Sequence, residues 1–299
     1  MPKIKAYAQL LRVPHWIKNI LVFVPLFFNL NLFDGSLLRN TGAGFVCFSL
    51  LASVIYILND LRDIDKDRRH SVKCRRPLAS GSVSQRQALI AVVLLSAVLI
   101  GLFALAARES PLYSLKAAGL LALYAALNIG YSWGLKNIPI IDVTILASGY
   151  VIRLLFGAVI AGVDVSVWLY LIITMGAYYL GLGKRRNEIS GGEKETRSVM
   201  RFYSHNFLDK NMYLCQALCV VFYALWSIDP ATVKTLNTGA FVYTIPLIFI
   251  ILLKYSLNIE TGSDGDPAPV LLHDKTLVLL CAVYLASAFG IIYFHRIIP

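Results

Sequence analysis

The sequence predicts an all-α, polytopic membrane protein, and three observations support this fold class. Of the 299 residues, 58% are hydrophobic, whereas soluble domains are usually about 45–50% apolar, and the mean hydropathy is +0.67. Apolar runs of about 20 residues, the length that crosses bilayer hydrocarbon, recur along the whole chain. No soluble segment or low-complexity linker separates these runs. We therefore expect residues 1–299 to form a single integral membrane domain.

Nine apolar segments qualify as membrane-spanning helices. The first follows a basic stretch but is not followed by a small-residue cleavage site, so we interpret it as a retained helix and not as a signal peptide. The expected spans cover residues 17–33, 42–63, 86–107, 112–131, 139–161, 165–183, 212–228, 239–257 and 275–295.

The distribution of basic residues predicts the orientation of these spans. With the N-terminus in the cytoplasm, 22 Lys and Arg residues fall on the cytoplasmic side and five on the outer side, while Arg153 lies within a span. Cytoplasmic loops normally carry this excess. We therefore expect a multi-pass protein of the cell inner (plasma) membrane, with its N-terminus and longest loops in the cytoplasm. The net charge of +11 follows from this asymmetry and suits anionic lipid headgroups; without a separate basic domain, it does not indicate nucleic acid binding.

Cysteine and histidine patterns exclude two kinds of site. The five cysteines contain no CxxC pair, and four of them lie in or near spans, where Cys acts as a small apolar residue. The five histidines show no metal-ligand spacing. We therefore predict no disulfide, no zinc site and no catalytic histidine.

A group of acidic and amide side chains lies at the end of the second span. At about 100° per residue in a helix, Asn59, Asp60, Asp63 and Asp67 share a face about 100° wide, whereas Asp65 points elsewhere. Carboxylates this close repel one another unless a cation lies between them. Oxygen ligands suit Mg²⁺, which is usually bound through one or two carboxylates plus substrate phosphates. We call these four residues the acid stripe and predict that they bind Mg²⁺ in a membrane enzyme that handles a diphosphate.

A solvated helix end is the alternative interpretation of the acid stripe. Its acids would then pair with neighbouring basic residues, as charge runs usually do. The stripe begins inside an apolar run, however, where ionisable groups are costly and usually functional. This position favours the metal-binding interpretation.

Two basic motifs lie in the expected cytoplasmic loops. Arg75 and Arg76 carry guanidinium groups that match phosphate oxygens in pairs, although the positive-inside bias alone would also account for them. Lys184, Arg185 and Glu188 follow two glycines, and the spacing of Lys184 and Glu188 places them on one helical face. This second motif is not a Walker A loop. Its alternative interpretation is a helix end whose long side chains reach the membrane surface.

Other polar residues lie within or beside spans. Tyr131 and Lys136 precede the fifth span, in which Asp142 and Arg153 share a face, with Arg153 about 16 Å deeper. A buried Arg needs a partner or a wet cavity, so we expect either an acid on another helix or a cavity open to the cytoplasm. Lys18 lies at the entry to the first span, where Lys is also an ordinary interfacial residue.

These motifs together resemble those of the UbiA-type intramembrane prenyltransferases, and within them the polyprenyl-phosphate (decaprenyl-phosphate) 5-phosphoribosyltransferase branch. The resemblance extends over nearly the whole chain, in fixed order and spacing. The motifs that carry it are Arg12-x-Pro-x-Trp16-x-Lys18-Asn19, Asn59-Asp-x-Arg-Asp63-x-x-x-Asp67, Arg76-Pro77-x-Ala-x-Gly81, Gly134-Leu-Lys136, Ile152-Arg153, Gly183-Lys184-Arg185-x-x-Glu188, Gly265-Asp-Pro267 and Asp274.

The resemblance implies nine helices around a cytoplasm-facing cavity and a defined reaction. A polyprenyl phosphate would react with 5-phosphoribosyl diphosphate to give polyprenyl-phosphoryl-5-phosphoribose and diphosphate, with Mg²⁺ as cofactor and with a role in cell-wall biogenesis. The phosphate acceptor is already ionised, so no strong general base is needed. The catalytic candidates are Asp60, Asp63, Asp67, Lys18, Lys136 and Lys184. The substrate-binding candidates are Asn59, Arg75, Arg76, Tyr131, Arg153, Arg185 and Glu188.

Two other functions remain open from the sequence. Aromatic prenyltransferases of the family share the acid stripe but carry a second Asp-rich motif after the sixth span, where this chain has Lys184, Arg185 and Glu188. A non-catalytic cation transporter would use the stripe as its ion site, although the carboxylates cluster at one membrane face. A homo-oligomer is compatible with the sequence, and the polyprenyl chain length is open.

Overall fold

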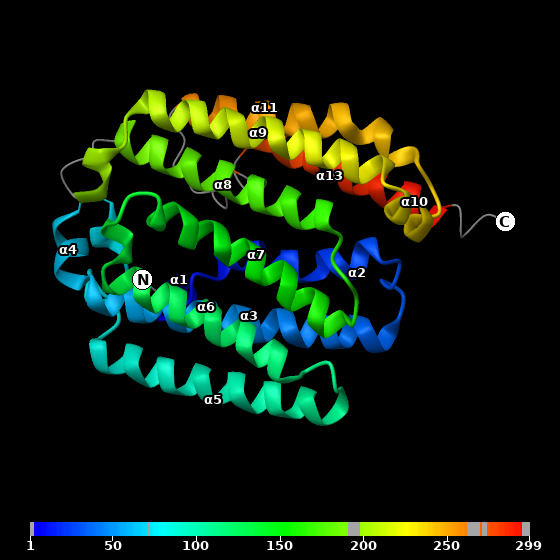
Figure 1. Cartoon of the computed structure of the whole chain (residues 1–299). Coiled ribbons are helices and arrows are strands. Elements are labelled where there is room, and N and C mark those ends of the chain that lie inside the picture. Colours follow the sequence, from blue (N-terminus) through cyan, green and yellow to red (C-terminus); the bar gives the residue numbers. More distant parts are fainter. Residues whose placement is uncertain (1–2, 71, 191–197, 262–269, 271–273, 295–299) are drawn as a thin grey trace.

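The computed structural model describes residues 3–70, 72–190, 198–261, 270 and 274–294. Within these ranges the regular structure is helical and contains no strand, which confirms the all-α prediction. The long helices run side by side along one axis of the molecule (Figure 1).

Six helical units in the described ranges are long and apolar enough to cross a membrane. A seventh is formed if a bent N-terminal pair, with an angle of 48° between its parts, counts as one span. The six units are α3 (Gly35–Arg62), α5 (Gln85–Glu109), α7 (Ile141–Ala161), α9 (His205–Ile228), η6 with α11 (Ala240–Thr244 and Ile245–Glu260), and α13 with the π-helical turn η7 (Lys275–Phe289 and Gly290–Phe294). The bent pair consists of α1 (Lys3–Leu10) and the run of η1 and α2 (Val13–Phe23 and Val24–Phe28).

Two of the nine expected spans are long enough to cross a membrane but are not apolar enough to count with these units. They correspond to α6 (Leu115–Trp133) and α8 (Val167–Ser190). α8 continues past the expected end of its span through the charged segment 184–188, and α6 ends in polar residues. These polar ends lower the mean hydropathy of both helices. The count of nine spans is therefore not confirmed.

Side-chain caps fix where several helices begin. The carboxylate of Asp34 accepts hydrogen bonds from the backbone N–H groups of Ser36 and Leu37, at 2.9 and 3.0 Å, at the start of α3. Ser84 forms a reciprocal capping box with Gln87 at the start of α5, and Ser204 caps α9. Such caps satisfy backbone donors that have no partner within the helix.

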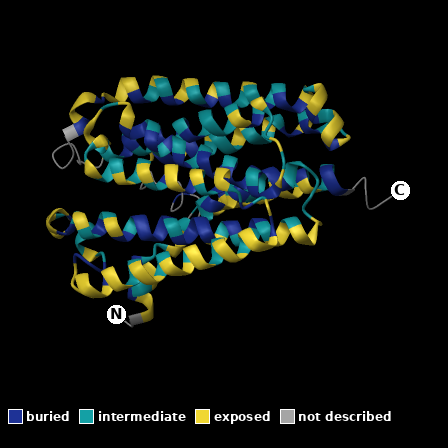
Figure 2. Ribbon diagram, turned by 60° about the horizontal axis from the view of Figure 1, so that its bottom comes forward, coloured by how far each residue is buried: buried dark blue, intermediate teal, exposed yellow. Residues whose placement is uncertain are grey.

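Burial distinguishes the central helices from those at the periphery. In α3 and α7, 61% of the most apolar window is buried inside the protein, against 6% in α5. α5 packs on α3 at the edge of the bundle, and its outer surface is exposed (Figure 2). Because α5 is the most apolar of these helices, its exposed surface suits contact with lipid.

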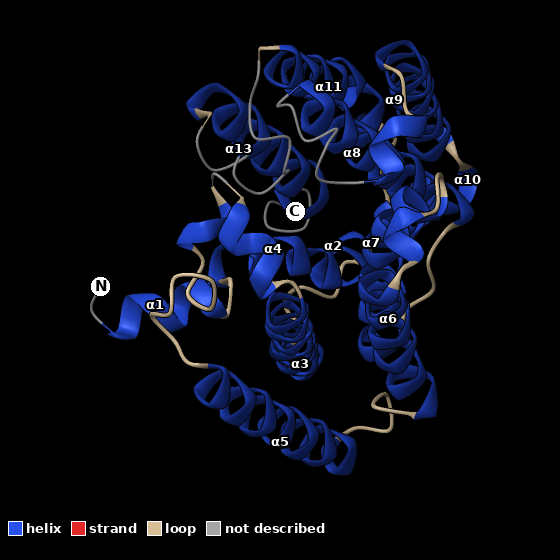
Figure 3. Cartoon of the chain, turned by 90° about the vertical axis from the view of Figure 1, so that its left-hand side faces the viewer, coloured by secondary structure: helices blue, strands red, loops and turns tan. Residues whose placement is uncertain are grey.

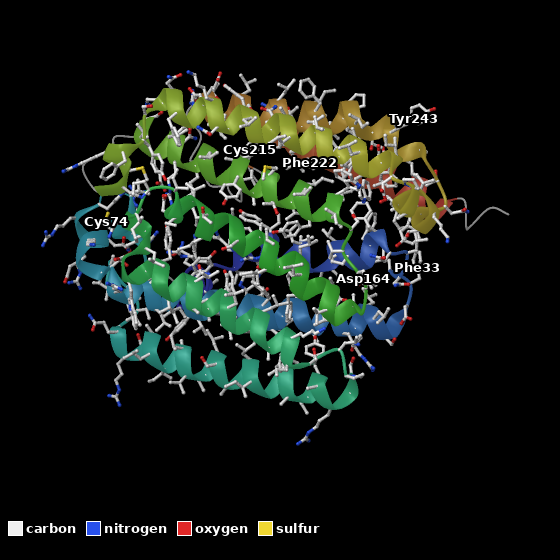
Figure 4. All side chains as sticks on the ribbon, viewed as in Figure 1. Phe33, Cys74, Asp164, Cys215, Phe222 and Tyr243 are labelled. Atoms are coloured by element: carbon white, nitrogen blue, oxygen red, sulfur yellow. The ribbon has the colours of Figure 1, made fainter. Side chains whose placement is uncertain are left out.

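The connecting segments that carry the sequence motifs gather at one end of the molecule. We call the end that carries residues 63–70, 72–84, 134–140 and 198–204 the loop end. Cys74 marks this end and Asp164 lies at the opposite end (Figure 4). Viewed from the loop end, α3, α6 and α7 group together with α5 outside them (Figure 3).

Candidate active site

The acid stripe lies at the loop end, across the junction of α3 and α4 (Ile64–Arg69). α3 ends at Arg62, and Asp63 is both its C-cap and the N-cap of α4. Helical hydrogen bonds continue through the junction, from Asp63 N to Asn59 O at 3.0 Å and from Asp67 N to Asp63 O at 2.8 Å. The helical periodicity is therefore preserved across the break, as the prediction of a shared face requires.

Burial agrees with the predicted face. Asp60 and Asp67 are 3% and 5% exposed, and the side chain of Asp63 is 15% exposed. The side chain of Asp65, which was predicted to point elsewhere, is 85% exposed. The stripe therefore faces the protein interior.

Two arginines bind the carboxylates of the stripe. Arg76 Nη1 donates to Asp60 Oδ1 at 3.0 Å and to Asp67 Oδ2 at 2.7 Å. Arg12 Nη2 donates to the same oxygen of Asp60 at 2.5 Å. Removing such carboxylates from water is tolerated when charged donors satisfy them. Arg12 lies 48 residues from Asp60 in the sequence, and Arg76 lies 16 residues from Asp60 and 9 from Asp67. The fold thus brings two separate segments with fixed positive charge to the stripe.

The remaining members of the stripe are held by two residues at the end of α6 and just after it. Lys136 Nζ donates to both oxygens of Asp63, at 2.9 and 3.3 Å. Lys136 belongs to the short helix η3 (Leu135–Asn137) between α6 and α7. Ser132 Oγ, near the end of α6, donates to Asn59 Oδ1 at 2.9 Å. The structure therefore brings Lys136 to the acid stripe, as the proposed site requires.

A second group of charged side chains surrounds Arg185 on α8. Its Nε donates to Asp142 Oδ2 at 2.7 Å, its Nη2 donates to the hydroxyl of Tyr131 at 2.9 Å, and its Nη1 donates to Glu188. The side chains of Arg185 and Asp142 are both 0% exposed. Tyr203 completes the group by donating to Asp142 Oδ1 at 2.5 Å. We call these five residues the Arg185 cluster.

The Arg185 cluster adjoins the acid stripe through consecutive residues of α6. Tyr131 bonds Arg185, and its neighbour Ser132 bonds Asn59. Side chains of adjacent residues diverge by about 100° on a helix, so the end of α6 lies between the two groups. The stripe and the Arg185 cluster are therefore parts of one site at the loop end.

Arg153 lies deeper in the bundle, and its partners in the described part of the chain are not carboxylates. Its guanidinium donates to Asn19 Oδ1 at 2.7 Å, to Gly149 O at 2.7 Å and to the hydroxyl of Tyr124 at 3.0 Å. It also stacks 4.8 Å from the ring centre of Phe48, a cation–π arrangement that is favourable when desolvated. Arg153 thereby joins η1, α6 and α7.

The other predicted residues lie at different depths. Arg75 is exposed, whereas the adjacent Arg76 turns towards the stripe. Lys18 and Lys184 are half-buried. The side chain of Glu188 is 13% exposed and bonded to Arg185.

The residues of the stripe fit a magnesium ion. Asp60 and Asp67 each direct one oxygen at the same positively charged atom, Arg76 Nη1, so the pair already holds one cation between two carboxylates. Within the described ranges no three His, Cys, Asp or Glu side chains gather closely enough to form a complete metal site. Mg²⁺ commonly takes only one or two carboxylates and completes its coordination with water and substrate phosphates. The donor set therefore suits a metal that binds together with a diphosphate.

Four residues of the site were not among the candidates that the sequence offered: Arg12, Ser132, Asp142 and Tyr203. Asp142 carried a signal, because an acid within a span requires a partner, but the sequence did not identify Arg185 as that partner. Arg12 lies in a motif that carries the resemblance, yet its contact with Asp60 depends on how the bent N-terminal pair packs on α3. Ser132 and Tyr203 carried no signal of their own.

The comparisons with known proteins concern the family and the fold. The model of the family described as "UbiA prenyltransferase family" matches residues 22–273. Among the solved structures, a UbiA homolog from Archaeoglobus fulgidus bound to GPP and Mg²⁺ superposes with a TM-score of 0.70 over 96% of this chain and 99% of that chain. Its sequence identity is 21%, so this likeness concerns the fold.

Two curated relatives are similar over nearly their whole length. The decaprenyl-phosphate phosphoribosyltransferase of Corynebacterium glutamicum is 33% identical over 97% of this chain and 86% of its own. The protein of the same name from Mycolicibacterium smegmatis is 30% identical over 95% of this chain and 91% of its own.

Proposed function

The chain belongs to the UbiA prenyltransferase family, and from that premise we propose that it transfers 5-phosphoribose from 5-phosphoribosyl diphosphate to a polyprenyl phosphate. A lipid phosphate oxygen attacks the anomeric carbon of the donor, and the bond from that carbon to the diphosphate oxygen breaks. The products are polyprenyl-phosphoryl-5-phosphoribose and diphosphate. The acceptor phosphate enters as an anion, so no side chain has to remove a proton from it.

The observation that carries this proposal is the similarity, over nearly the whole chain, to two proteins named decaprenyl-phosphate phosphoribosyltransferase. The composition of the site agrees with that chemistry. Carboxylates that converge on a cation lie next to Arg and Lys side chains at the acid stripe. A reaction between two phosphorylated substrates needs this combination, because negative charge must be neutralised on donor, acceptor and leaving group.

Asp60 and Asp67 would hold Mg²⁺, with Asp63 and Asn59 beside them. When bound, Mg²⁺ supplies positive charge that stabilises a departing diphosphate. The carboxylates are pre-positioned for this role by α3 and α4, and burial strengthens their electrostatic effect. Arg76, which now bridges Asp60 and Asp67, would then be available to the 5-phosphate of the donor.

The remaining basic residues are assigned by position. Lys136, 2.9 Å from Asp63, would contact donor phosphates at the same edge of the stripe. Lys18 and Lys184 would contact the acceptor or donor phosphates, and Arg75 would attract the donor from the surface. The lipid phosphate would approach from the membrane side of the stripe.

Arg185 and Arg153 would act by holding other residues. Each of the three guanidinium nitrogens of Arg185 donates to a neighbour in its cluster, so Arg185 fixes Tyr131 and Glu188 in place. Glu188 would then accept a hydrogen bond from a ribose hydroxyl of the donor. Arg153 bonds Asn19 and thereby fixes the segment of η1 that carries Lys18.

We also propose how the molecule lies in the membrane. α6 and α8 would complete a set of nine spans, since each packs against membrane-crossing helices and runs beside them (Figure 1). The loop end would face the cytoplasm, where 22 of the 28 Lys and Arg residues would lie. A cavity between the spans would open there, in the plasma membrane, and the polyprenyl tail would leave it sideways into lipid.

A transfer assay on the purified protein tests the proposed function. The protein is incubated with Mg²⁺, a polyprenyl phosphate and 5-phosphoribosyl diphosphate labelled in the ribose, and label is followed into the organic phase. We expect lipid-soluble label that requires both Mg²⁺ and the lipid. Absence of such label, together with transfer from a prenyl diphosphate to an aromatic acceptor, would replace the proposal with the aromatic prenyltransferase alternative.

A further inference from the structure

The hydroxyl of Tyr203 connects two backbone regions of the site. It accepts a hydrogen bond from the backbone N–H of Ile140 at 2.7 Å and donates one to Asp142 Oδ1 at 2.5 Å. Tyr203 is 4% exposed and packs in the hydrophobic core between α8, α9 and α11. It follows the short helix η5 (Ser198–Phe202), far from α6 and α7 in the sequence.

The first of these bonds holds a strained residue. Ile140 has φ 69° and ψ −45°, close to the rare and strained γ-turn conformation. A β-branched residue at positive φ is an outlier that persists only when its surroundings hold it. The Tyr203 hydroxyl is the side-chain partner of the Ile140 backbone N–H, so it is well placed to hold this conformation.

The strained residue closes the short segment that presents Lys136. This segment begins at Gly134, with φ 147°, and ends where α7 begins after Ile140. Lys136 lies in its middle and reaches Asp63 of the acid stripe at 2.9 Å. The direction of the Lys136 side chain therefore depends on the backbone angles at the two ends of the segment.

The second hydrogen bond of Tyr203 reaches the other half of the site. Asp142 Oδ1 accepts from Tyr203, and Asp142 Oδ2 accepts from Arg185 at 2.7 Å. Arg185 in turn bonds Tyr131 and Glu188. A single hydroxyl thus supports both the Lys136 segment and the Arg185 cluster.

We propose that Tyr203 is a positioning residue that holds Ile140 in its strained conformation and so directs Lys136 at the acid stripe. The role assigned to Lys136 in catalysis rests on the proposed function, whereas the structural link from Tyr203 to Lys136 does not. Burial, and then the hydrogen bond to Asp142, raise the pKa of the Tyr203 phenol, so the hydroxyl stays a donor at neutral and moderately alkaline pH.

Three variants separate this role from general stability. Tyr203→Phe keeps the ring and removes both hydrogen bonds. Tyr179→Phe is the matched control, because Tyr179 is 1% exposed and its hydroxyl bonds Leu252 O and Ser256, both at 2.7 Å, away from the site. Ile140→Gly in the Tyr203→Phe background supplies a residue that adopts positive φ without strain. Ile140 is 51% exposed, so its removal leaves no buried cavity.

The first readout is the reactivity of Lys136 itself, measured without any substrate. The purified variants are treated with an amine-acetylating reagent, and the rate at Lys136 is followed by peptide mass spectrometry. Lys254, which pairs with Asp274 at 2.8 Å, serves as an internal reference. We expect Tyr203→Phe to raise the rate at Lys136 roughly threefold or more, and Ile140→Gly to reverse most of that rise.

The second readout is the transfer reaction. We expect Tyr203→Phe to lower kcat/KM for 5-phosphoribosyl diphosphate roughly tenfold, the scale of one lost hydrogen bond to a charged group. KM for the polyprenyl phosphate should change less than about twofold, because lost positioning of Lys136 affects the donor side. The Ile140→Gly double variant should recover a substantial part of the loss.

Transferase activity tests the proposed function, and the acetylation rates test the role of Tyr203. A wild-type protein without transferase activity would refute the proposed function, while the acetylation rates would still decide the role of Tyr203. An unchanged rate at Lys136 in Tyr203→Phe, or an equal rise in Tyr179→Phe, would overturn the inference whatever the activity. If Ile140→Gly left the higher acetylation rate at Lys136 unchanged, the inference would be overturned too, because Tyr203 would then not act through the conformation of Ile140.

Discussion

At the scale of single residues, the contact that most constrains the chemistry is the one between Arg76 and two carboxylates. Asp60 and Asp67 are nearly fully buried and both bond Arg76 Nη1. Two ionised carboxylates this close repel each other unless a positive charge lies between them. Arg76 therefore offsets the repulsion between these two carboxylates.

The stripe and its off-face neighbour give the first prediction. We expect Asp67→Asn to lower the transfer rate at least about 100-fold, the scale on which one electrostatic group at a reacting centre acts. Asp65→Asn is the matched control in the same helix, and because its side chain is 85% exposed the rate should change less than about twofold. Initial rates of label transfer under saturating Mg²⁺ measure both. Equal losses of transfer rate in the two variants would show that activity does not depend on the position of a carboxylate on the face of the acid stripe.

Replacement of Arg76 gives a second prediction, which concerns metal binding. Without the bridging guanidinium, Asp60 and Asp67 have one fewer competing cation, so Arg76→Gln should bind Mn²⁺ about tenfold more tightly in the absence of donor, or about 1.4 kcal/mol. Electron paramagnetic resonance of free and bound Mn²⁺ measures this affinity. Arg75→Gln changes the net charge equally but removes an exposed side chain, so it controls for general electrostatics. Weaker Mn²⁺ binding in Arg76→Gln than in Arg75→Gln would contradict the assignment.

Residues of the site were predictable from sequence where a local rule applied. Helical periodicity placed Asp60, Asp63 and Asp67 on one face because the hydrogen-bond pattern continues through the junction at Asp63. Pairings between helices followed no such rule. The sequence places Asp142 within a span, but only the packing of α7 on α8 identifies Arg185 as its partner. The strain at Ile140 is visible only in the backbone angles.

At the scale of elements, α7 and η1 approach each other closely at Gly157. A Cβ atom built on Gly157 would lie 2.1 Å from the carbonyl oxygen of Val22 and 2.8 Å from its carbonyl carbon. These are backbone atoms, so a side-chain rotation does not relieve the contact. Gly157 therefore permits η1 to lie directly on α7, where Arg153 bonds Asn19.

This approach predicts a specific effect on stability. Gly157→Ala should separate η1 from α7 and destabilise the protein by about 1–3 kcal/mol, the usual range for overpacking. Gly101→Ala is the control, since nothing lies within 4 Å of a Cβ at that position of α5. Thermal unfolding in detergent should show a lowered Tm for the first variant and no loss for the second. An unchanged Tm in Gly157→Ala would mean that the two segments are not in contact.

Some of the helices could be predicted from the sequence and others could not. Long apolar runs predicted α5 and α7 to within about two residues of their observed bounds, because length and hydropathy dominate there. The expected span 42–63 matches the end of α3, but α3 begins earlier, at Gly35. The first expected span, residues 17–33, is instead the 3₁₀ helix η1 followed by the short α2, which ends at Phe28. Its conformation depends on the polar contacts of Trp16 and Asn19 with Ser53 and Ser49 on α3, which no local pattern specifies.

At the scale of the whole molecule, the charge asymmetry and the folded arrangement agree. The described part of the loop end is rich in Lys and Arg and includes Cys74, whereas Asp164 lies at the opposite end (Figure 4). Short loops rich in Lys and Arg normally stay in the cytoplasm. In the orientation proposed above, the candidate site would face the compartment that would supply a soluble phosphorylated donor.

Thiol labelling in intact cells checks this orientation. In a variant whose other four cysteines are replaced, Cys74 should react with a membrane-impermeant maleimide only after the membrane is permeabilised. A Cys74→Ser, Asp164→Cys version of the same variant should react in intact cells. The reverse pattern would place the loop end outside and contradict the proposed topology.

The most direct measurement of the central claim is the mass of the lipid product. Purified protein is incubated with Mg²⁺, 5-phosphoribosyl diphosphate and a polyprenyl phosphate, and the lipid fraction is examined by mass spectrometry while diphosphate release is measured in parallel. Phosphoribosyl transfer predicts a polyprenyl phosphate heavier by one 5-phosphoribosyl group, in an amount equal to the diphosphate released. A lipid of unchanged mass, with or without release of diphosphate, would contradict it.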